Sequence, residues 1–577
     1  MDTSIVEEKK VFPELGSQDE ISLRIKKYTE GAIKFQERRH EDWRENYALY
    51  RNKVFINRLT QRQTANVPLM KETIKTILSK TDELSDLYFE SLSNDKQTET
   101  FLNEYWKWWV DKDRFEMKDI VDKKQEGLYG RSTMKLNLFD GRPTAEVLEP
   151  YDWICDEYAD PTDIDNTAMF QGHINIFRSI SQLEANPLYD QDAVSRLKVQ
   201  YGTAMGLIKS EENRKQMEAR NERLQDLGVE SIDAPELGET YVQLSENHIR
   251  LWSEEREKLV IWVRVMADNE VLLHKPLEDM FGVNFFLFTT WADDIEKTDL
   301  YSDGIGDIVR QPNKILNSWF SQLVENRTLR NFGMTFYDST QGDGKWIPQT
   351  YEPAPWGWYP TAGDPNKVTK RVDIPELSES LDEMSFVISM VERATASTAT
   401  EKGSKESGET TLGQIKLMLA NSNERITSIS KFYKKARQEF GEKWYQFLVA
   451  NEKWIKPVKL YKKSIKGKYY EEEVSPKDWK DEVGFVCRIV SKSERSSQSL
   501  EEIQKMQAIA PIFEGNTAFN NAMKEKALSI LDLPQEAVDE ILNFEDQETE
   551  IAGAEALPTP ASPASPEFST KQPLPVQ

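Results

Sequence analysis

The sequence predicts an α+β protein that is predominantly helical. Three observations support this prediction: long stretches with apolar residues at helical spacing, a middle region where they alternate at strand spacing, and a Gly-, Pro- and Trp-rich interval between two striped helices. With 577 residues, the chain is too long for one ordinary hydrophobic core. We therefore expect several structural parts.

The N-terminal region reads as helices. Residues 1–20 are expected to be a flexible N-terminus, and residues 21–50 form a charged amphipathic helix that ends in the aromatic residues Trp43, Tyr47 and Tyr50. A second helix is predicted over residues 67–92, with Pro68 in its first turn, where proline is tolerated. Helical spacing continues over residues 101–130 and stops at Gly130.

After Gly130 the apolar period changes from helical to alternating. In STMKLNLFDGRPTAEVL, Met134, Leu136 and Leu138 share one face and DGRP is a turn signal, so this stretch predicts a hairpin. TAMFQGHINIF, HIRLWSEEREKLVIWVRVMADNEVLLHKPLE and VNFFLFTT add strands. Between them, GLIKSEENRKQMEARNERLQDLG is polar nearly all round, which favours a helix that projects from the core.

Two striped helices then enclose a small module. The first covers residues 302–330, and because proline fits poorly inside a helix, we expect it to begin near Pro312 or to kink there. Residues 331–375 predict a small subdomain of turns and short strands, whose aromatic residues either fill a mini-core or form exposed anchors for a partner. The second helix covers residues 376–393.

The C-terminal region begins with an interval that has no apolar anchor. Residues 394–410 are expected to be a mobile loop. The helix that starts at residue 411 keeps its apolar positions in register to about residue 455, a length of roughly 65 Å at 1.5 Å per residue. A strand, VGFVCRIVSKS, and helices within residues 497–545 follow, and the Pro/Ala/Ser-rich residues 546–577 are expected to be disordered.

Composition limits the classes of function. Acidic residues outnumber basic residues by 99 to 74, and the net charge of -25 argues against tight nucleic-acid binding, although nucleic acid could still slide past such a surface. Two distant cysteines, Cys155 and Cys487, predict buried thiols in a reducing cytoplasm. The N-terminus lacks a signal region, and the most apolar stretches are too short to span a bilayer, so we expect no membrane segment.

Motifs for catalysis are weak. The chain has neither a P-loop nor a Gly-x-Ser-x-Gly elbow, and its four histidines are scattered. The acidic run DWICDEYADPTDID could hold Mg²⁺ in a nuclease-like site, although Ala168 occupies the position of the glycine that a calcium loop requires. Turn-capping carboxylates are the favoured interpretation of this run. The carboxylates of this acidic run are Asp152, Asp156, Asp160, Asp163 and Asp165. We predict no catalytic, cofactor-binding or metal-ligating residue in the chain.

The order of the parts and three short stretches point to one family. The stretches are EGLYGRSTMKLN, VLEPYDWICDEYADP and SDGIGDIVRQPNKILN. The parts are an α+β unit, a striped helix, a loop module, a returning helix, a small-residue loop, a very long helix and a helical end. Over roughly residues 21–544 the chain resembles the portal proteins of tailed double-stranded DNA bacteriophages. It departs from members with a long helical barrel, because its C-terminal tail is rich in Pro, Ala and Ser.

The resemblance implies a portal-type subunit with wing, stem, clip and crown. About twelve such subunits form a ring at one capsid vertex, through which a separate terminase motor drives DNA. It assigns residues 21–301 to the wing, 302–330 and 376–393 to the stem helices, 331–375 to the clip, 394–410 to a channel loop that faces DNA, 411–496 to the long wing helix and following strands, and 497–545 to the crown.

The resemblance also implies partners and site residues. The expected partners are further copies of the chain, the terminase large subunit, the tail adaptor, the major capsid and scaffold proteins, and double-stranded DNA that is only weakly contacted. The protein would have no enzymatic activity or cofactor, and would reside in the host cytoplasm during assembly and then in the virion. Stem packing is expected from Ile315, Leu316, Trp319, Phe320, Leu323, Leu381, Met384 and Ile388; clip docking from Trp346, Trp356, Trp358 and Tyr359; DNA-facing contact from Thr400, Lys402, Ser404 and Lys405.

A conduit gives the acidic composition a physical reason. About twelve copies at -25 each carry roughly -300 charges, and like charge lowers the friction of DNA passage. Two other functions remain open at this point. One is a metal-dependent nucleic-acid enzyme that uses the acidic run at residues 152–165, and the other is a cytoplasmic scaffold protein that binds through the Trp-rich loop.

Overall fold

The computed structural model describes residues 18–53, 56–57, 62–63, 65–82, 87–93, 95–139, 141–201, 206–208, 221–222, 225, 240–267, 270–331, 335–338, 340, 357–361, 363–364, 366, 369–371, 380–395, 412–463, 469–480 and 484–489. The chain divides into two compact units, Met1–Val458 with Val474–Lys492, and Lys459–Glu473 with Ser493–Gln577. The predicted crown helices and C-terminal tail lie outside the described residues.

The first two helices differ in how well the sequence predicted them. Helix α1 (Gln18–Tyr50) confirms the first prediction. Helix α2 (Leu69–Asp82) ends well before residue 92, so the single predicted helix was wrong in its second half. That half contains strand β3 (Leu87–Ser91), which pairs with the distant β18 (Phe485–Ile489). A partner so far along the chain leaves no mark in local periodicity.

The next helical stretch is two helices, α3 (Lys96–Asp113) and α4 (Phe115–Tyr129). Asp95 caps α3 by accepting hydrogen bonds from two backbone N–H groups of its first turn. The break comes at Arg114, whose φ of 53° is left-handed. The end of α4 at Gly130 is confirmed, because this glycine forms a left-handed cap.

The larger sheet of the first unit has the order β11-β10-β9-β7-β6, and β8 pairs in parallel with β9. Neighbours along the main path are antiparallel. The helix predicted from residue 206 was wrong at its start, because β8 occupies that position. The strands are β6 (Trp153–Cys155), β7 (Phe170–Ser179), β8 (Gly206–Ile208), β9 (Thr240–Ser253), β10 (Lys258–Ala267) and β11 (Glu270–Pro276).

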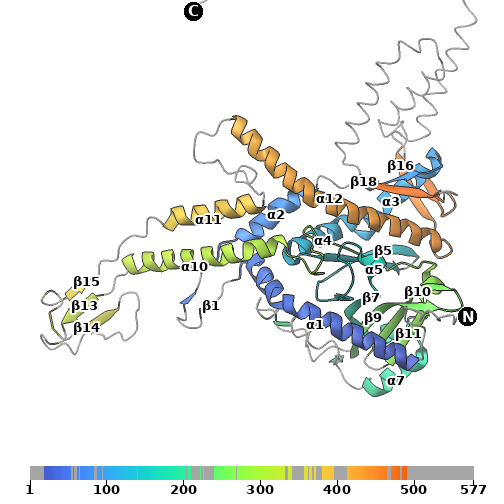
Figure 1. Cartoon of the computed structure of the whole chain (residues 1–577), viewed down its shortest axis with the longest axis horizontal. Helices are drawn as coiled ribbons and strands as arrows, with labels where there is room; N and C mark the ends of the chain where they lie inside the picture. Colours follow the sequence, from blue (N-terminus) through green and yellow to red (C-terminus); the bar gives the residue numbers. More distant parts are fainter. Residues whose placement is uncertain are drawn as a thin grey trace, which may run out of the picture. The chain divides into compact units, whose positions relative to one another are not determined.

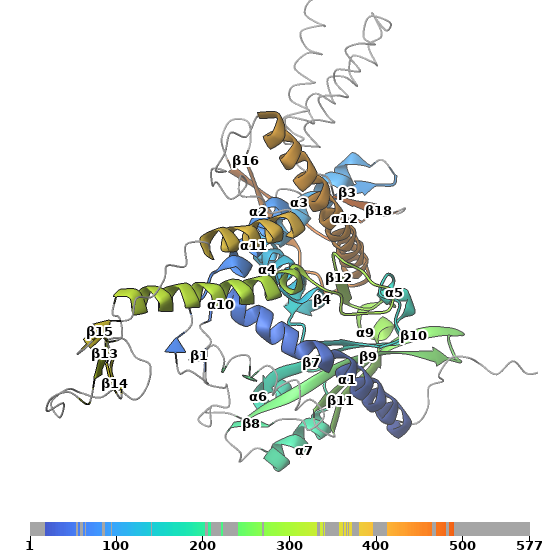
Figure 2. The ribbon, with the colours of Figure 1, turned by 60° about the vertical axis from the view of Figure 1, so that its left-hand side comes forward.

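Helix α1 lies across strands of this sheet (Figures 1 and 2). Its apolar stripe and one face of the sheet form a buried cluster, and each fully buried aliphatic side chain contributes about 1.5–3 kcal/mol. The helix therefore covers one face of the sheet, and the opposite face is free to contact other parts of the chain. The cluster contains Ile21, Ile25, Ala32, Ile33, Ile154, Phe170, Ile174, Ile249, Leu251 and Met266.

A smaller antiparallel sheet has the order β12-β4-β5. Strands β4 (Ser132–Phe139) and β5 (Arg142–Leu148) form the predicted hairpin, with Phe139 paired to Arg142 across the turn. Strand β12 (Phe288–Trp291) adds to the other edge of β4. The hairpin predicted from the sequence is thus confirmed, although burial does not alternate along β4, because Ser132 to Leu136 are all buried.

The long helix α12 (Leu412–Ala450) packs its C-terminal half into an aromatic core. Trp444 meets the ring of Trp106 edge to face at 4.8 Å, and Trp106 stacks on Trp109 at 4.9 Å. The helix ends at Ala450, earlier than the predicted residue 455. Just after this end, the Asn451 side chain donates to the Phe447 carbonyl. The predicted register is confirmed where side chains are described, since Tyr433, Ala436, Phe440, Trp444 and Phe447 are buried.

Short elements complete the described structure. They are β1 (Ile56–Asn57), β2 (Arg62–Gln63), α5 (Ile164–Thr167), α6 (Ile180–Glu184), α7 (Gln191–Tyr201), α9 (Leu277–Phe281), and the paired strands β16 (Val458–Lys463) and β17 (Tyr469–Val474). Cys155 and Cys487 are both buried free thiols, as expected. Among the helices that the structure describes, none has the length and apolar character needed to cross a membrane.

Candidate functional site

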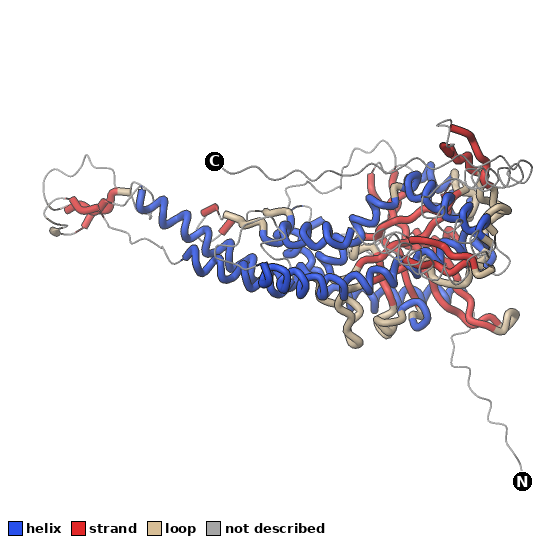
Figure 3. The backbone as a smooth tube through the Cα atoms, turned by 90° about the horizontal axis from the view of Figure 1, so that it is seen from above, coloured by secondary structure: helices blue, strands red, loops and turns tan. Residues whose placement is uncertain are grey.

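The candidate site is a helical arm with a small sheet at one end. Helices α10 (Ile305–Asn331) and α11 (Ser380–Thr395) pack side by side (Figure 3). The chain between them forms β13 (Thr335–Asp338), β14 (Trp358–Thr361) and β15 (Thr369–Arg371), with β13 in the centre. We call α10, α11 and this sheet the arm.

Glycines allow the base of the arm to approach α4 closely. Gly130 has a φ of 80°, and a Cβ atom on it would lie 1.8 Å from the Ser302 carbonyl oxygen. A Cβ on Gly304 would lie 2.6 Å from the Gly130 nitrogen, and one on Gly306 would lie 2.6 Å from the Leu128 carbonyl oxygen. Two of the three stretches on which the portal resemblance rests therefore meet here, backbone against backbone.

An aromatic cluster brings the third of these stretches, VLEPYDWICDEYADP, to the same place. The Trp43 ring of α1 makes edge-to-face contacts with Tyr129 at 6.0 Å, Tyr151 at 5.3 Å and Tyr301 at 5.6 Å. Its indole N–H donates to the Tyr129 carbonyl at 3.1 Å. Gln36, also on α1, donates to the carbonyls of Pro150 and Trp153. Helix α1 thus joins segments that are far apart in sequence into one junction.

Ion pairs fix α1 to the start of α10. Arg39 lies 2.7 Å from Asp303 and 2.8 Å from Asp307. Arg310 lies 2.8 Å from Asp307 and 2.9 Å from Asp42 of α1. Because Asp307 and both arginines are largely removed from solvent, these pairs are screened less than pairs on an open surface. The direction of α10 is therefore set by charge as well as by packing.

Asparagines connect α10 to the start of α2. Asn313 accepts from the Met70 N–H at 2.9 Å, and Asn317 accepts from the Val67 N–H at 2.7 Å. These contacts satisfy donors at a helix N-terminus, where backbone N–H groups lack intrahelical partners. The helix passes through Pro312 and begins at Ile305, so of the two alternatives a start near Pro312 was wrong, and a kink there stays a prediction. Contacts to α1, α2 and α4 surround this first part of α10 and compensate for the missing proline donor.

The predicted stem residues divide into three groups. Leu316 and Met384 are buried, and Trp319, Phe320, Leu323 and Ile388 are partly buried. Ile315 and Leu381 are exposed. Four more apolar residues of these helices are exposed and were not in the predicted set: Ile308, Val324, Phe386 and Met390.

The predicted clip contains the small sheet, so short strands in this interval are confirmed. Tyr337 is buried, and its ring lies 6.4 Å from that of Trp358, which is 37% exposed. The Tyr359 ring packs 5.6 Å from Phe336. Arg371 donates to carbonyls at the C-terminus of α10, where a positive charge is favourable. Trp358 and Tyr359 therefore combine packing with exposure.

Other predicted positions lie outside the described residues. These are Trp346 and Trp356 in the clip, and Thr400, Lys402, Ser404 and Lys405 in the expected channel loop. Ala394 and Thr395, the first two residues of that predicted loop, belong instead to the last turn of α11. The helix continues because Thr395 is buried and its hydroxyl donates to the Val391 carbonyl.

A buried charge network connects α4 with α12. Arg437 of α12 lies 2.6 Å from Asp119 and also pairs with Asp122. Lys123 lies 2.8 Å from Asp119, and the Tyr433 hydroxyl donates to the same carboxylate. Burial alone would raise the pKa of Asp119, but Arg437 and Lys123 hold it below its ordinary value. Asp119, Asp122, Lys123 and Arg437 therefore each have a partner of opposite sign.

The five carboxylates of the acidic run all have partners within the chain. Asp156 accepts from the Tyr158 N–H and Asp160 from the Thr162 N–H, which agrees with the interpretation as turn-capping carboxylates for these two residues. Asp163 accepts from the Asn166 amide, whereas Asp152 accepts from the distant Asn175 amide and Asp165 pairs with Lys443 at 3.0 Å, so the interpretation was wrong for Asp152 and Asp165. Within the described residues, no group of three or more His, Cys, Asp or Glu side chains is arranged to hold a metal ion.

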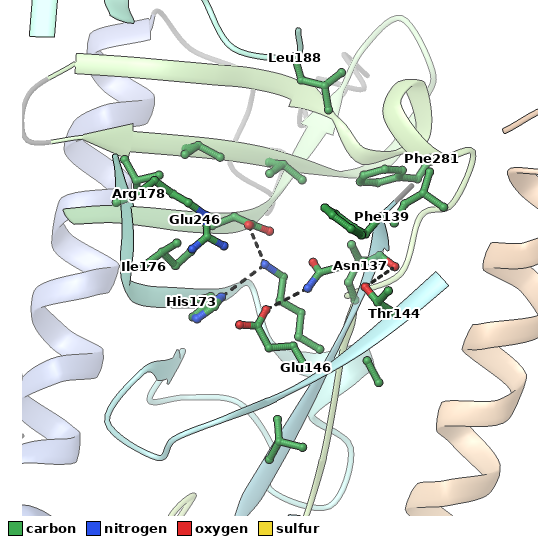
Figure 4. Close-up of a pocket in the computed structure, with 18 of the residues that line it drawn as sticks. Asn137, Phe139, Thr144, Glu146, His173, Ile176, Arg178, Leu188, Glu246 and Phe281 are labelled. Carbon is green, nitrogen blue, oxygen red and sulfur yellow. Dashed lines mark hydrogen bonds and ion pairs between the residues drawn. The ribbon is translucent and has the colours of Figure 1, made fainter. Parts of the chain in front are cut away.

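A pocket of about 840 Å³ lies beside the face of the larger sheet that α1 does not cover (Figure 4). Apolar and polar side chains both line it, and Lys135 lies at the centre of one group of buried polar residues. There Lys135 is 2.6 Å from Glu246 and 3.5 Å from the His173 ring. Burial, with Lys135 as the next cause, holds the pKa of His173 well below its usual value. Burial would raise the pKa of Glu246, but Lys135 and His248 lower it.

Comparisons with known proteins do not identify the chain: neither the family models nor the curated proteins contain a match.

Sequence reasoning missed the pocket and the buried charge network. The network has a local signal, because Asp119, Asp122, Lys123 and Glu126 lie three or four residues apart on one helical face. That signal ordinarily indicates a solvated face. Only Arg437, more than 300 residues later, shows that this face is buried.

Proposed function

We propose that this chain is a portal subunit that forms a ring at one capsid vertex. The ring would be a channel for DNA packaging and ejection and a docking site for the terminase and the tail adaptor. The main support is the arm, in which two packed helices enclose a small sheet and expose apolar side chains along their length. Six large apolar residues of α10 and α11 are 43% to 60% exposed: Ile308, Ile315, Val324, Leu381, Phe386 and Met390.

These side chains indicate that a single copy is incomplete. Large apolar residues gathered on neighbouring helices usually mark a surface that another protein covers. In a closed ring, each subunit would cover the arm of the next through a heterologous contact. The arm is also firmly held at its base, through the glycine contacts and the Arg39 and Arg310 ion pairs. A rigid arm suits repeated packing around an axis.

The small sheet supports a docking role for the clip. Trp358 is partly exposed on β14, and aromatic residues of this kind dominate the binding energy of many interfaces. The sheet is attached to α10 through Arg371, so a partner bound there would be held in a fixed position relative to the arm. The terminase and the tail adaptor would bind here in succession.

The alternatives receive less support from the described residues. The carboxylates of the acidic run are used in local turns and in an ion pair with Lys443, which gives no reason to prefer a metal-dependent nuclease. A cytoplasmic scaffold that binds through Trp358 would not need exposed apolar residues on α10 and α11.

The mass of the purified protein tests the proposal directly. Light scattering should give a particle of about twelve times 66.9 kDa, and negative-stain images of the same peak should show a central hole. Portal subunits can need partners to assemble, so a monomer would be co-expressed with the capsid and scaffold proteins. A chain that stays monomeric there and at every salt concentration would refute the proposal.

A further inference from the structure

Helix α4 buries four charged residues and leaves three large apolar residues in solvent. Asp119, Asp122, Lys123 and Glu126 are all buried. On the other side, three large apolar residues are exposed: Met117 at 66%, Ile120 at 44% and Val121 at 37%. A surface helix normally does the opposite, because burial of apolar area stabilises the fold. The exposed face therefore needs its own explanation.

The ion pairs of the buried face fix this orientation. Arg437 pairs with Asp119 and Asp122, and Asp122 also accepts from the Ser132 hydroxyl and the Trp291 indole. Rotation of α4 would separate these buried charges from their partners, which typically costs about 3–5 kcal/mol for each broken pair. The helix consequently cannot turn to bury its apolar residues within its own chain.

The apolar face of α4 continues into the pocket. Met117 and Val121 are among its lining residues, together with Phe139 and Leu188, which are also exposed (Figure 4). Ile120 lies beside them on α4 but outside the pocket. The apolar surface is thus larger than the pocket itself. This size favours a macromolecular segment over a small ligand enclosed by the pocket.

The charged residues of the pocket indicate the sign of the partner. Lys118 pairs with Asp113 at 2.7 Å, and Lys135 pairs with Glu246. Arg114, Arg178 and Glu146 also line the pocket, and no described group of opposite charge lies within ion-pair distance of these three side chains. The two arginines outnumber the one carboxylate, so in a chain with a net charge of -25 this surface is complementary to an anionic partner.

We propose that the exposed face of α4 and the adjoining pocket bind an acidic segment of another protein that carries large apolar side chains. An apolar side chain of the segment would enter the pocket, and its neighbours would cover Met117, Ile120 and Val121. Carboxylates on the segment would pair with Arg114 and Arg178. This docking surface is separate from the arm, and the proposal does not depend on ring formation.

Selection from random short peptides displayed on phage tests the chemistry, with the full-length protein as the target. Enriched peptides should combine several carboxylates with Leu, Ile, Phe or Trp. Synthetic copies should bind Val121→Glu and Arg178→Glu about tenfold or more weakly than they bind the unaltered protein. The control is Leu23→Glu, which changes an exposed apolar residue of α1 and should bind the peptides normally.

Several outcomes would overturn the proposal. Failure to enrich any peptide, enrichment of basic peptides, or equal binding by all three variants would each contradict it. A loss of self-association in Val121→Glu, measured by light scattering, would show that a second copy of the chain covers this face instead. Circular dichroism keeps the test valid, because an unchanged spectrum for Val121→Glu and Arg178→Glu excludes unfolding as the cause of weak binding.

Discussion

Gly130 is a single residue on which the base of the arm depends. Its φ of 80° is unfavourable for other residues, and a Cβ atom would overlap the backbone of Ser302. We predict that Gly130→Ala lowers the free energy of unfolding by about 3 kcal/mol or more, because backbone must move as well as adopt strain. Urea unfolding followed by tryptophan fluorescence measures this loss.

A second glycine, Gly363, separates the cost of backbone strain from the cost of a steric clash at the Cβ position. Gly363 also has a positive φ, 111°, but no atom lies within 4 Å of the position of its Cβ. Gly363→Ala should therefore cost only about 1–2 kcal/mol, the backbone strain alone. Equal losses in the two variants would show that the close approach of α4 and α10 contributes nothing to stability.

Glu126 and Asp293 are buried carboxyl groups that interact at the end of α4. Glu126 accepts from the Asp293 N–H at 3.0 Å. Burial, and next the charge of Asp293, raise the pKa of Glu126 well above its ordinary 4.5. An acid with a raised pKa binds its proton more tightly in the folded protein. Its contribution to stability is therefore complete below about 4.5 and is lost as the pH rises toward the raised value.

Replacement of Glu126 by glutamine tests whether stability falls with rising pH, as a raised pKa requires. Glu126→Gln keeps an oxygen that accepts the Asp293 N–H and cannot ionise. We predict that stability of the unaltered protein, relative to the variant, falls with rising pH by up to about 1.4 kcal/mol per pH unit in the window above the ordinary pKa. Urea midpoints over a pH series measure the difference, and parallel pH profiles would contradict the raised pKa.

At the scale of elements, local periodicity predicted what depends on near neighbours. The hairpin at Phe139 and Arg142 and the end of α4 at Gly130 follow from turn and cap chemistry. Strand β3 was missed because its partner β18 is remote in sequence, and the break at Arg114 was missed because an arginine seldom adopts a left-handed conformation. Elements defined by distant contacts therefore escaped prediction.

The candidate site was predicted in outline but not in its detailed contacts. The stripes of α10 and α11 gave positions such as Leu316 and Met384, which are buried. Trp43 was noted as aromatic, but its role as a junction for Tyr129, Tyr151 and Tyr301 required the folded arrangement. The pocket likewise depends on two sheets that meet only in three dimensions.

Helix α11 offers a test of the proposed ring contacts. Phe386 and Met390 lie one turn apart and are 60% and 51% exposed. We predict that the double variant Phe386→Glu, Met390→Glu stays dissociated at concentrations where the unaltered protein forms a ring, because two charges would be buried without partners. Light scattering measures the mass, and circular dichroism should show unchanged helix content.

The matched control introduces two glutamates at exposed apolar positions outside the arm. Leu23 and Val199 are exposed apolar residues of α1 and α7, outside the arm. The double variant Leu23→Glu, Val199→Glu should assemble normally, since isolated surface changes seldom alter stability by more than about 0.5 kcal/mol. Loss of the ring in both double variants would show that added charge, and not the arm, prevents assembly.

At the scale of the whole molecule, the acidic composition and the arm lead to one prediction about DNA. In the proposed ring, residues 396–410 would face the channel, and a strongly negative ring would hold DNA only through a few cations such as Lys402 and Lys405. We predict that removal of residues 404–408 leaves ring mass unchanged but lowers the amount of nuclease-protected DNA in assembled heads. The arm contacts that we propose for ring formation involve other residues.

Removal of residues 561–565 from the Pro/Ala/Ser tail is the control, because it deletes a segment of equal length that contains no charged residue. DNA protection should stay normal in that variant. If deletion of residues 404–408 abolishes the ring, the loop packs between subunits and the assignment to the channel is wrong. If neither deletion alters DNA protection, Lys405 does not act on DNA, which contradicts this prediction.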